Sequence, residues 1–128
     1  MAVRLGTMAQ ETVQNQTIRL RKTYRETEYG GFTRTYVLTP SGQFIKPVAS
    51  ERSNSGRHGW DEWVLGNGRY VVITINRPNT RNGPKPFEVS IRCVEVGNGG
   101  VKELISRIMY VMRIGVGDLK EWAMGICP

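Results

Sequence analysis

Aromatic and basic side chains alternate in the first half of the sequence, in a pattern that could bind nucleic acid. Phe32, Arg34 and Tyr36 lie two residues apart, as do Phe44 and Lys46, and this spacing places side chains on one face of a β-strand. Rings stack on unpaired bases with about 1 to 3 kcal/mol each, while cations contact phosphates. The alternative is that the three rings belong to the core, with the two cations extending from its margin.

Two polar segments add further candidates for binding. Residues 50–59 are rich in serine, glycine and arginine and lead into Trp60, so they could close over a strand of nucleic acid. The tryptophan pair Trp60 and Trp63 also fits a hairpin end packed on the core. Residues 77–86 contain three prolines and three cations, as expected of an exposed loop. The predicted phosphate contacts are Arg34, Lys46, Arg52, Arg57 and Arg92, and the predicted stacking residues are Tyr36, Trp60 and Tyr70.

The evidence for catalysis is much weaker. His58, Asp61 and Glu62 could share proton transfer in a small nuclease, but no second histidine and no nucleophile motif accompany them. Cys93 and Cys127 lie far apart without the spacing of metal ligands. We therefore predict two free thiols, no cofactor, no metal site and no enzymatic activity.

Charge is the strongest compositional signal. The 128 residues include 18 Lys and Arg against 11 Asp and Glu, a net charge of +7, and such a field attracts polyanions. Arginine predominates over lysine, which favours planar, multidentate contacts. Single-stranded DNA or RNA, bound without sequence preference, is the predicted partner. A basic surface with no partner is the alternative.

The predicted fold is α+β: a single antiparallel sheet of about five strands with an N-terminal helix and C-terminal helices packed on one face. Residues 1–8 are expected to be a flexible N-terminus and residues 9–128 one basic domain. Helices are predicted over residues 8–29 and 101–113 and in a short segment after Asp118. The predicted strands cover residues 32–39, 43–49, 60–65, 69–76 and 87–96, and two hairpins turn at residues 40–42 and 66–68.

Alternation within two strands predicts the core. Val71, Ile73, Val89 and Ile91 should face the helix over 101–113, whereas the opposite face should meet solvent or ligand.

The predicted layout joins a basic first helix, a sheet carrying Phe32-Thr-Arg-Thr-Tyr36 and Arg69-Tyr-Val-Val-Ile-Thr-Ile75, and the helix over 101–113. This layout resembles the ThermoDBP-type archaeal single-stranded DNA-binding proteins across most of residues 10–125. The resemblance implies a compact helix-and-sheet domain with an aromatic, basic-rimmed cleft for single-stranded DNA or RNA. Arg34, Tyr36 and Trp60 would contribute to that cleft.

The remaining predictions concern assembly and location. Trp122, Met124 and Ile126 cluster near the end of the sequence and favour a homodimer or larger oligomer. No apolar run approaches the roughly 18 residues of a membrane span, and residues 1–8 lack the apolar stretch of a secretory signal. We expect a cytoplasmic protein with no membrane partner. A protein-interaction or assembly module, such as a viral or scaffold protein, is the main alternative function.

Overall fold

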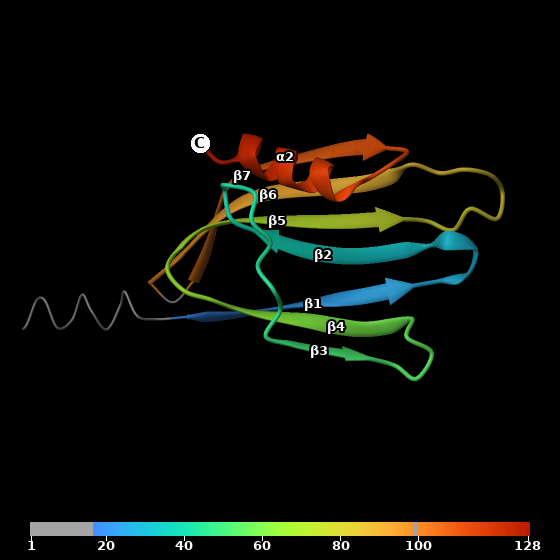
Figure 1. Ribbon diagram of the computed structural model, residues 1–128, viewed down its shortest axis with the longest axis horizontal. Helices are drawn as coiled ribbons and strands as arrows, with labels where there is room; N and C mark the ends of the chain where they lie inside the picture. Colours follow the sequence, from blue (N-terminus) through green and yellow to red (C-terminus); the bar gives the residue numbers. More distant parts are fainter. Residues whose placement is uncertain (1–16, 99) are drawn as a thin grey trace, which may run out of the picture.

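The chain folds into an antiparallel sheet in a computed structural model that describes residues 17–98 and 100–128 (Figure 1). Within these residues the sheet has seven strands in the order β3-β4-β1-β2-β5-β6-β7. The strands are β1 (Ile18–Glu26), β2 (Phe32–Leu38), β3 (Ala49–Arg52), β4 (His58–Leu65), β5 (Gly68–Arg77), β6 (Phe87–Gly97) and β7 (Gly100–Val111); a 3-10 turn, η1 (Glu28–Gly30), follows β1, and a helix, α2 (Val116–Ile126), follows β7. The prediction of a single antiparallel sheet is confirmed, but the predicted α+β arrangement of about five strands under several helices is wrong.

The predicted first helix is a strand over the part that the structure describes. β1 pairs antiparallel with β4 from Ile18 opposite Leu65 to Arg25 opposite His58. Apolar and polar residues alternate along β1, so one face becomes half-buried and the other exposed. Residues 18–26 of the predicted helix over 8–29 therefore follow a strand pattern. The other part of that predicted helix, residues 8–16, and the predicted flexible residues 1–8 lie outside the described residues.

The predicted helix over 101–113 is also a strand. β7 pairs with β6, but Cys93 lies opposite Ile105 whereas Val94 lies opposite Glu103, so Leu104 is an extra residue in the ladder. Such a bulge interrupts the period of two. The apolar residues on its two sides thus acquired a spacing that imitates a helix.

Strand pairing also differs from the prediction. β4 and β5 are joined by a short turn, yet β4 pairs with β1 and β3 while β5 pairs with β2 and β6. The predicted strand over 43–49 is reduced to one bridge between Leu38 and Phe44. Residues 39–48 instead cross from β2 to β3, passing over β1 and β4 in the view of Figure 1. Neither predicted hairpin forms as two paired strands, because long-range pairing overrides the local turn signals.

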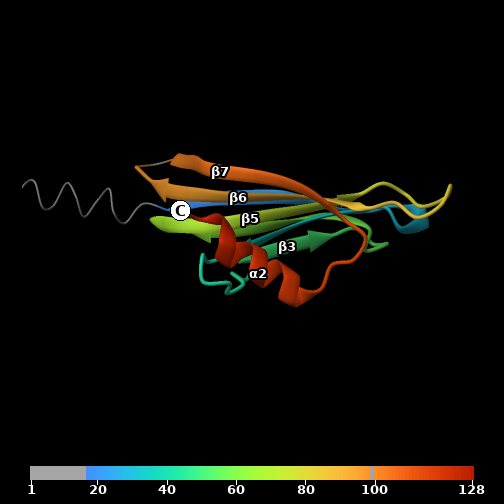
Figure 2. The same ribbon diagram turned by 90° about the horizontal axis from the view of Figure 1, so that it is seen from above.

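One face of the central strands is covered by α2. Val71, Ile73, Val89 and Ile91 are at most 2% exposed, as predicted. They pack in one cluster with three helix residues, Leu119, Ala123 and Ile126. Figure 2 shows α2 lying on one side of the sheet. The predicted core is therefore confirmed, although the element that covers it is α2 and not residues 101–113.

The opposite face is covered as well, so the prediction of an open second face is wrong for its central part. Val72 is 2% exposed and packs with Val94, Trp63 and Leu65. β1 pairs with β2 only at residues 25 and 26. Because β1 and β4 leave the edge of β2, their apolar side chains reach this face and form a second core.

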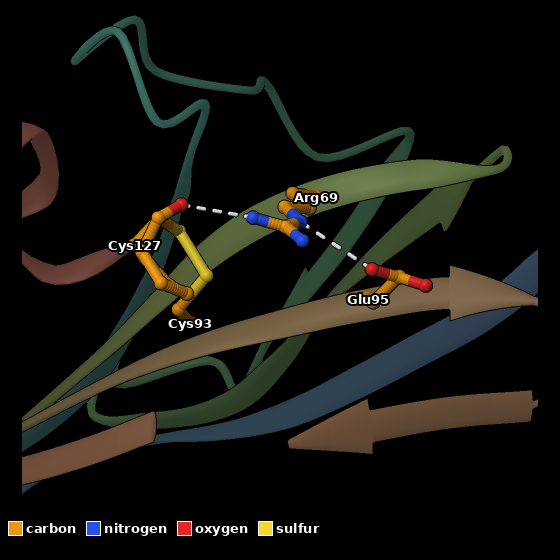
Figure 3. Close-up of a disulfide and its surroundings, with 5 residues drawn as sticks. Arg69, Cys93, Glu95 and Cys127 are labelled. Atoms are coloured by element: carbon orange, nitrogen blue, oxygen red, sulfur yellow. Dashed lines mark hydrogen bonds and ion pairs between the residues drawn. A yellow bond between two sulfur atoms is a disulfide. The ribbon is translucent and has the colours of Figure 1, made fainter. Parts of the chain in front are cut away.

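A disulfide links Cys93 in β6 to Cys127 after α2 (Figure 3). The prediction of two free thiols is wrong: 34 residues separate the cysteines, yet their Cα atoms lie 5.2 Å apart. Arg69 adds a second tie, because its Nη1 donates to the backbone oxygen of Pro128 at 2.9 Å and its Nε lies 3.3 Å from Oε2 of Glu95. The helix is thus fastened to the sheet at its C-terminal end.

Candidate functional site

A cleft opens where β1 leaves β2. It has a volume of about 230 Å³ and lies between β2, the crossing segment 44–47 and β4. The indole Nε1 of Trp63 donates to the carbonyl oxygen of Ile45 at 2.8 Å and holds the crossing segment in place. The polar and aromatic side chains that line the cleft include Arg34, Tyr36, Phe44, Lys46 and Asp61. Three of the eight predicted binding residues therefore meet in one place.

Rings and cations alternate along this cleft. The Cζ atom of Arg34 lies 5.6 Å from the ring centre of Tyr24 and 5.1 Å from that of Tyr36. The ring of Tyr36 meets that of Phe44 edge to face, with centres 6.1 Å apart. Lys120 of α2 ends the row, since its Nζ lies 5.3 Å from the Phe44 ring centre. We call this group, with Lys46 and Arg52, the aromatic–cation cleft.

Arg34 is the most informative residue in the cleft. Its side chain is half-buried, and within the described residues its guanidinium has no hydrogen bond or ion pair; the buried Nε is an unpartnered donor. A buried donor without an acceptor costs about 1 to 3 kcal/mol. The two neighbouring rings offset part of this cost through cation–π attraction. The cleft therefore contains a positive charge that an anionic ligand would neutralise.

Arg52 is used differently. Its Nη2 donates to Oδ1 of Asp61 at 2.9 Å, and its Nη1 donates to the carbonyl oxygens of Glu51 and Trp60, each at 2.9 Å. Ser50 donates to the same Asp61 oxygen at 2.6 Å. The Cζ atom also lies 4.2 Å from the ring centre of Tyr24. Arg52 thus packs against the Tyr24 ring at the edge of the cleft, and its positive charge is compensated by Asp61.

Tyr24 remains a neutral phenol at the edge of the cleft. Its hydroxyl donates to Oε2 of Glu26 at 2.8 Å. This hydrogen bond, with a smaller contribution from burial, raises the pKa of Tyr24 above its ordinary value. The ring therefore offers an uncharged aromatic surface beside Arg34 over the physiological pH range.

The other four predicted residues lie outside the cleft. Trp60 faces away from Tyr24 on β4, with Cζ of Arg21 stacked 3.9 Å from its ring centre. Arg57 is exposed in the turn between β3 and β4. Tyr70 packs against the second core, and its hydroxyl donates to the carbonyl oxygen of Gly66 at 3.0 Å. Arg92 lines a separate cavity. The structure therefore divides the predicted set among several surfaces.

His58, Asp61 and Glu62, the residues considered for a nuclease, do not form one site. His58 and Asp61 are three residues apart in β4 and so point to opposite faces of the sheet. Asp61 is engaged by Arg52 and Ser50. Glu62 accepts hydrogen bonds from Arg19 and Arg21 at 3.3 and 3.4 Å. This geometry offers no shared proton-transfer site among the three.

Sequence reasoning missed two members of the cleft. Tyr24 was placed in a predicted helix, although the alternation of Leu20, Lys22 and Tyr24 with polar residues was a usable strand signal. Lys120 reaches the cleft only because α2 packs on the sheet, where its Nζ donates to the carbonyl oxygen of Gly42 at 3.0 Å. No local pattern could have placed it there.

Comparison with solved structures shows the fold. ORF157 of Acidianus filamentous virus 1 is similar with a TM-score of 0.57 and 16% identity, over 74% of this chain and 61% of that chain. A variant of the same viral protein has a TM-score of 0.53 and 13% identity, over 73% and 60% of the two chains. An engineered protein, Northeast Structural Genomics Consortium target OR43, has a TM-score of 0.51 and 17% identity, over 73% and 59%. The matched region thus spans about three fifths of each similar structure.

No protein-family model and no curated protein sequence matches the chain. The likeness to ThermoDBP-type proteins rested partly on two helices, and residues 18–26 and 100–111 are strands. That the aromatic–cation cleft binds single-stranded nucleic acid, as this likeness implies, stays a prediction.

Three further expectations concern surroundings and assembly. Among the described residues, no helix is long and apolar enough to cross a membrane. The disulfide bears on location, because disulfides are typical of oxidising compartments and of intracellular proteins from hyperthermophiles; the cytoplasmic location stays a prediction. Of the three residues that favoured an oligomer, Ile126 is buried and Trp122 half-buried in the core, while Met124 is exposed. Of these three residues, only Met124 is therefore available for contact with another subunit, and oligomerisation stays a prediction.

Proposed function

We propose that the protein binds single-stranded nucleic acid in the aromatic–cation cleft and acts by binding, without catalysis. The observation that carries the proposal is Arg34, an uncompensated cation held between the rings of Tyr24 and Tyr36. A phosphate would supply the missing acceptor and counter-charge. The rings beside it offer surfaces on which unpaired bases stack.

Exposure within the cleft fits this division of roles. Phe44 is 38% exposed and Lys46 is exposed, whereas Arg34 and Tyr36 are half-buried. A base would stack first on Phe44 near Lys120, and the phosphate would be drawn toward Lys46 and Arg34. Paired bases in a duplex hide the faces that the rings need, so a duplex should bind more weakly.

The test is a fluorescence titration of the full chain with single-stranded DNA, single-stranded RNA and duplex DNA at two salt concentrations. We expect both single strands to bind more tightly than duplex. Affinity should fall as the salt concentration rises, because the free-energy gain from counterion release becomes smaller. Tightest binding to duplex would contradict the stacking model.

Arg34→Met tests the cleft itself, since methionine keeps an apolar stem and removes the charge. We expect an affinity loss of about tenfold to a hundredfold, in line with one charge-assisted hydrogen bond of about 1.5 to 3 kcal/mol. Arg113→Met is the matched control, because Arg113 is exposed and follows β7, at the sheet edge opposite to β3. Equal losses in the two variants would show that overall charge, and not the cleft, governs binding.

A second candidate function, assembly, is favoured by β7. It is the last strand of the sheet, so one row of its backbone groups has no strand partner within the described residues. Ile105, Ile108 and Tyr110 are 40%, 60% and 65% exposed. Long, apolar edge strands are templates for pairing with another chain.

Ile108→Lys separates assembly from nucleic-acid binding. A charge on an edge strand disfavours edge-to-edge pairing, so an assembly through β7 should dissociate to a monomer in light scattering. The matched control is Met124→Lys, which adds the same charge on the exposed side of α2. Thr33→Lys is not suitable as a control, because Thr33 lies in a strand inside the sheet. A wild-type chain that is monomeric at tens of micromolar would contradict this candidate.

A further inference from the structure

A second cavity borders the second core. It has a volume of about 260 Å³ and is enclosed by residues of β1, β4, β5, β6 and β7. Seven of its ten lining residues are aliphatic, among them Leu20, Val72 and Val94. No aromatic ring lines it. Its walls therefore suit an alkyl chain and offer no surface on which a base could stack.

Two cations meet at this cavity. Lys22 of β1 and Arg92 of β6 both line it, and Glu103 of β7 is the one acidic residue in the lining. Nη1 of Arg92 lies 3.9 Å from Oε1 of Glu103, whereas Lys22 has no hydrogen bond or ion pair among the described residues. One positive charge is therefore left without a partner beside an apolar space.

The surroundings of Lys22 show that this arrangement is unfavourable when the cavity holds no anion. Burial, and secondarily the charge of Arg92, lower the pKa of Lys22 below its ordinary value. An anion bound beside the two cations would offset both effects, because it would pair with the ammonium and compensate the repulsion between the like charges.

We propose that this cavity binds an amphipathic anion, a medium-chain carboxylate, with its head group between Lys22 and Arg92 and its alkyl chain along the aliphatic wall. The volume of the cavity lies just below the roughly 300 to 1,000 Å³ of common small-molecule sites. The alkyl chain of the ligand must therefore be short. A phosphodiester strand fits less well, because it would bring polar groups against aliphatic side chains that cannot satisfy them.

The test is isothermal titration calorimetry of octanoate into the full chain at neutral pH. We expect saturable binding, with hexanoate more than tenfold weaker, because each buried methylene contributes about 0.8 kcal/mol and 1.4 kcal/mol is a factor of ten. Octylammonium has the same tail and the opposite charge and should bind at least tenfold more weakly than octanoate. Equal binding of octanoate and octylammonium, or no binding of octanoate, would overturn the proposal.

Two variants locate the site. Lys22→Met keeps the length of the side chain and should weaken octanoate about tenfold, whereas Lys85→Met, at an exposed loop position, should have no effect. Val101→Phe fills the cavity from a rim position that is 51% exposed, so folding should survive while octanoate binding is lost. Circular dichroism checks the fold of each variant. Unchanged octanoate affinity in either Lys22→Met or Val101→Phe would place the ligand elsewhere and overturn the assignment.

Discussion

The two faces of the central strands differ in how they are filled. The face under α2 packs aliphatic side chains against the helix and is fastened by the Cys93–Cys127 disulfide. The face under β1 and β4 also has a buried core, but it borders a cavity of about 260 Å³, and a cleft of about 230 Å³ lies beside β2 where β1 leaves it; each contains a cation that lacks a counter-charge. The comparison indicates that the helix and the disulfide close the face under α2, whereas room for ligands is left where β1 and β4 diverge from the central strands.

The two cavities differ from each other in their walls. Rings line the aromatic–cation cleft and aliphatic side chains line the second cavity, although both contain an unpaired cation. The cation attracts an anion in either place, and the wall determines what can accompany it. This is why the same physical argument leads to nucleic acid in one site and to an alkyl carboxylate in the other.

The largest expected effect is on the α2 face. Replacing both cysteines by alanine opens a loop of 34 residues, which should lower the free energy of unfolding by about 3 to 4 kcal/mol. Urea denaturation measures the loss, and wild-type protein with reductant is the matched comparison. Affinity for single-stranded DNA should stay within twofold under conditions where the variant is folded. Loss of binding in a folded variant would show that the disulfide also positions the binding cleft.

Trp63→Phe should affect both stability and binding, since Trp63 belongs to the second core and positions the cleft. The side chain is 2% exposed, and its indole holds the carbonyl oxygen of Ile45. Loss of that hydrogen bond and of ring volume should cost about 2 to 3 kcal/mol of unfolding free energy. Thermal melting and the oligonucleotide titration check the two effects. A variant with wild-type binding would show that the crossing segment needs no such anchor.

Tyr36→Ala should weaken single-stranded binding by about 1 to 3 kcal/mol and leave the salt dependence nearly unchanged, because a ring stacks but displaces few counterions. Tyr36→Phe is the matched control, since it keeps the ring and removes only the hydroxyl. Titrations at several salt concentrations separate affinity from salt slope. Wild-type affinity in Tyr36→Ala would refute stacking in the cleft even if the protein binds nucleic acid through charge.

The smallest effect is expected for Arg57→Ala, at the exposed turn between β3 and β4. Losing one phosphate contact there should reduce affinity about equally for all sequences and flatten the salt slope by roughly one unit. The same salt titration measures it, with Arg113→Ala as the control at the other edge of the sheet. An unchanged slope would confine the phosphate contacts to the cleft.

Local patterns were sufficient for the central strands. Alternation predicted strands over residues 32–39, 69–76 and 87–96, nearly the observed bounds of β2, β5 and β6, and it identified Val71, Ile73, Val89 and Ile91 as buried. These strands lie in the middle of the sheet, where neighbours on both sides reinforce the local preference. The alternation of Arg34 and Tyr36 on one face likewise followed from the spacing alone.

The sequence by itself thus determined the central strands, their buried residues and the positive charge of the molecule. Tertiary structure alone decided the rest, because the deciding contacts are long-range. Residues 18–26 form a strand because they pair with β4. The bulge at Leu104 interrupts the alternation in β7, so the sequence pattern did not predict a strand there. Cys93 and Cys127 meet only once α2 has docked, and the same docking brings Lys120 to Phe44. The divergence of β1 from β2 then creates both cavities, and no pattern within a single segment of the chain records that divergence.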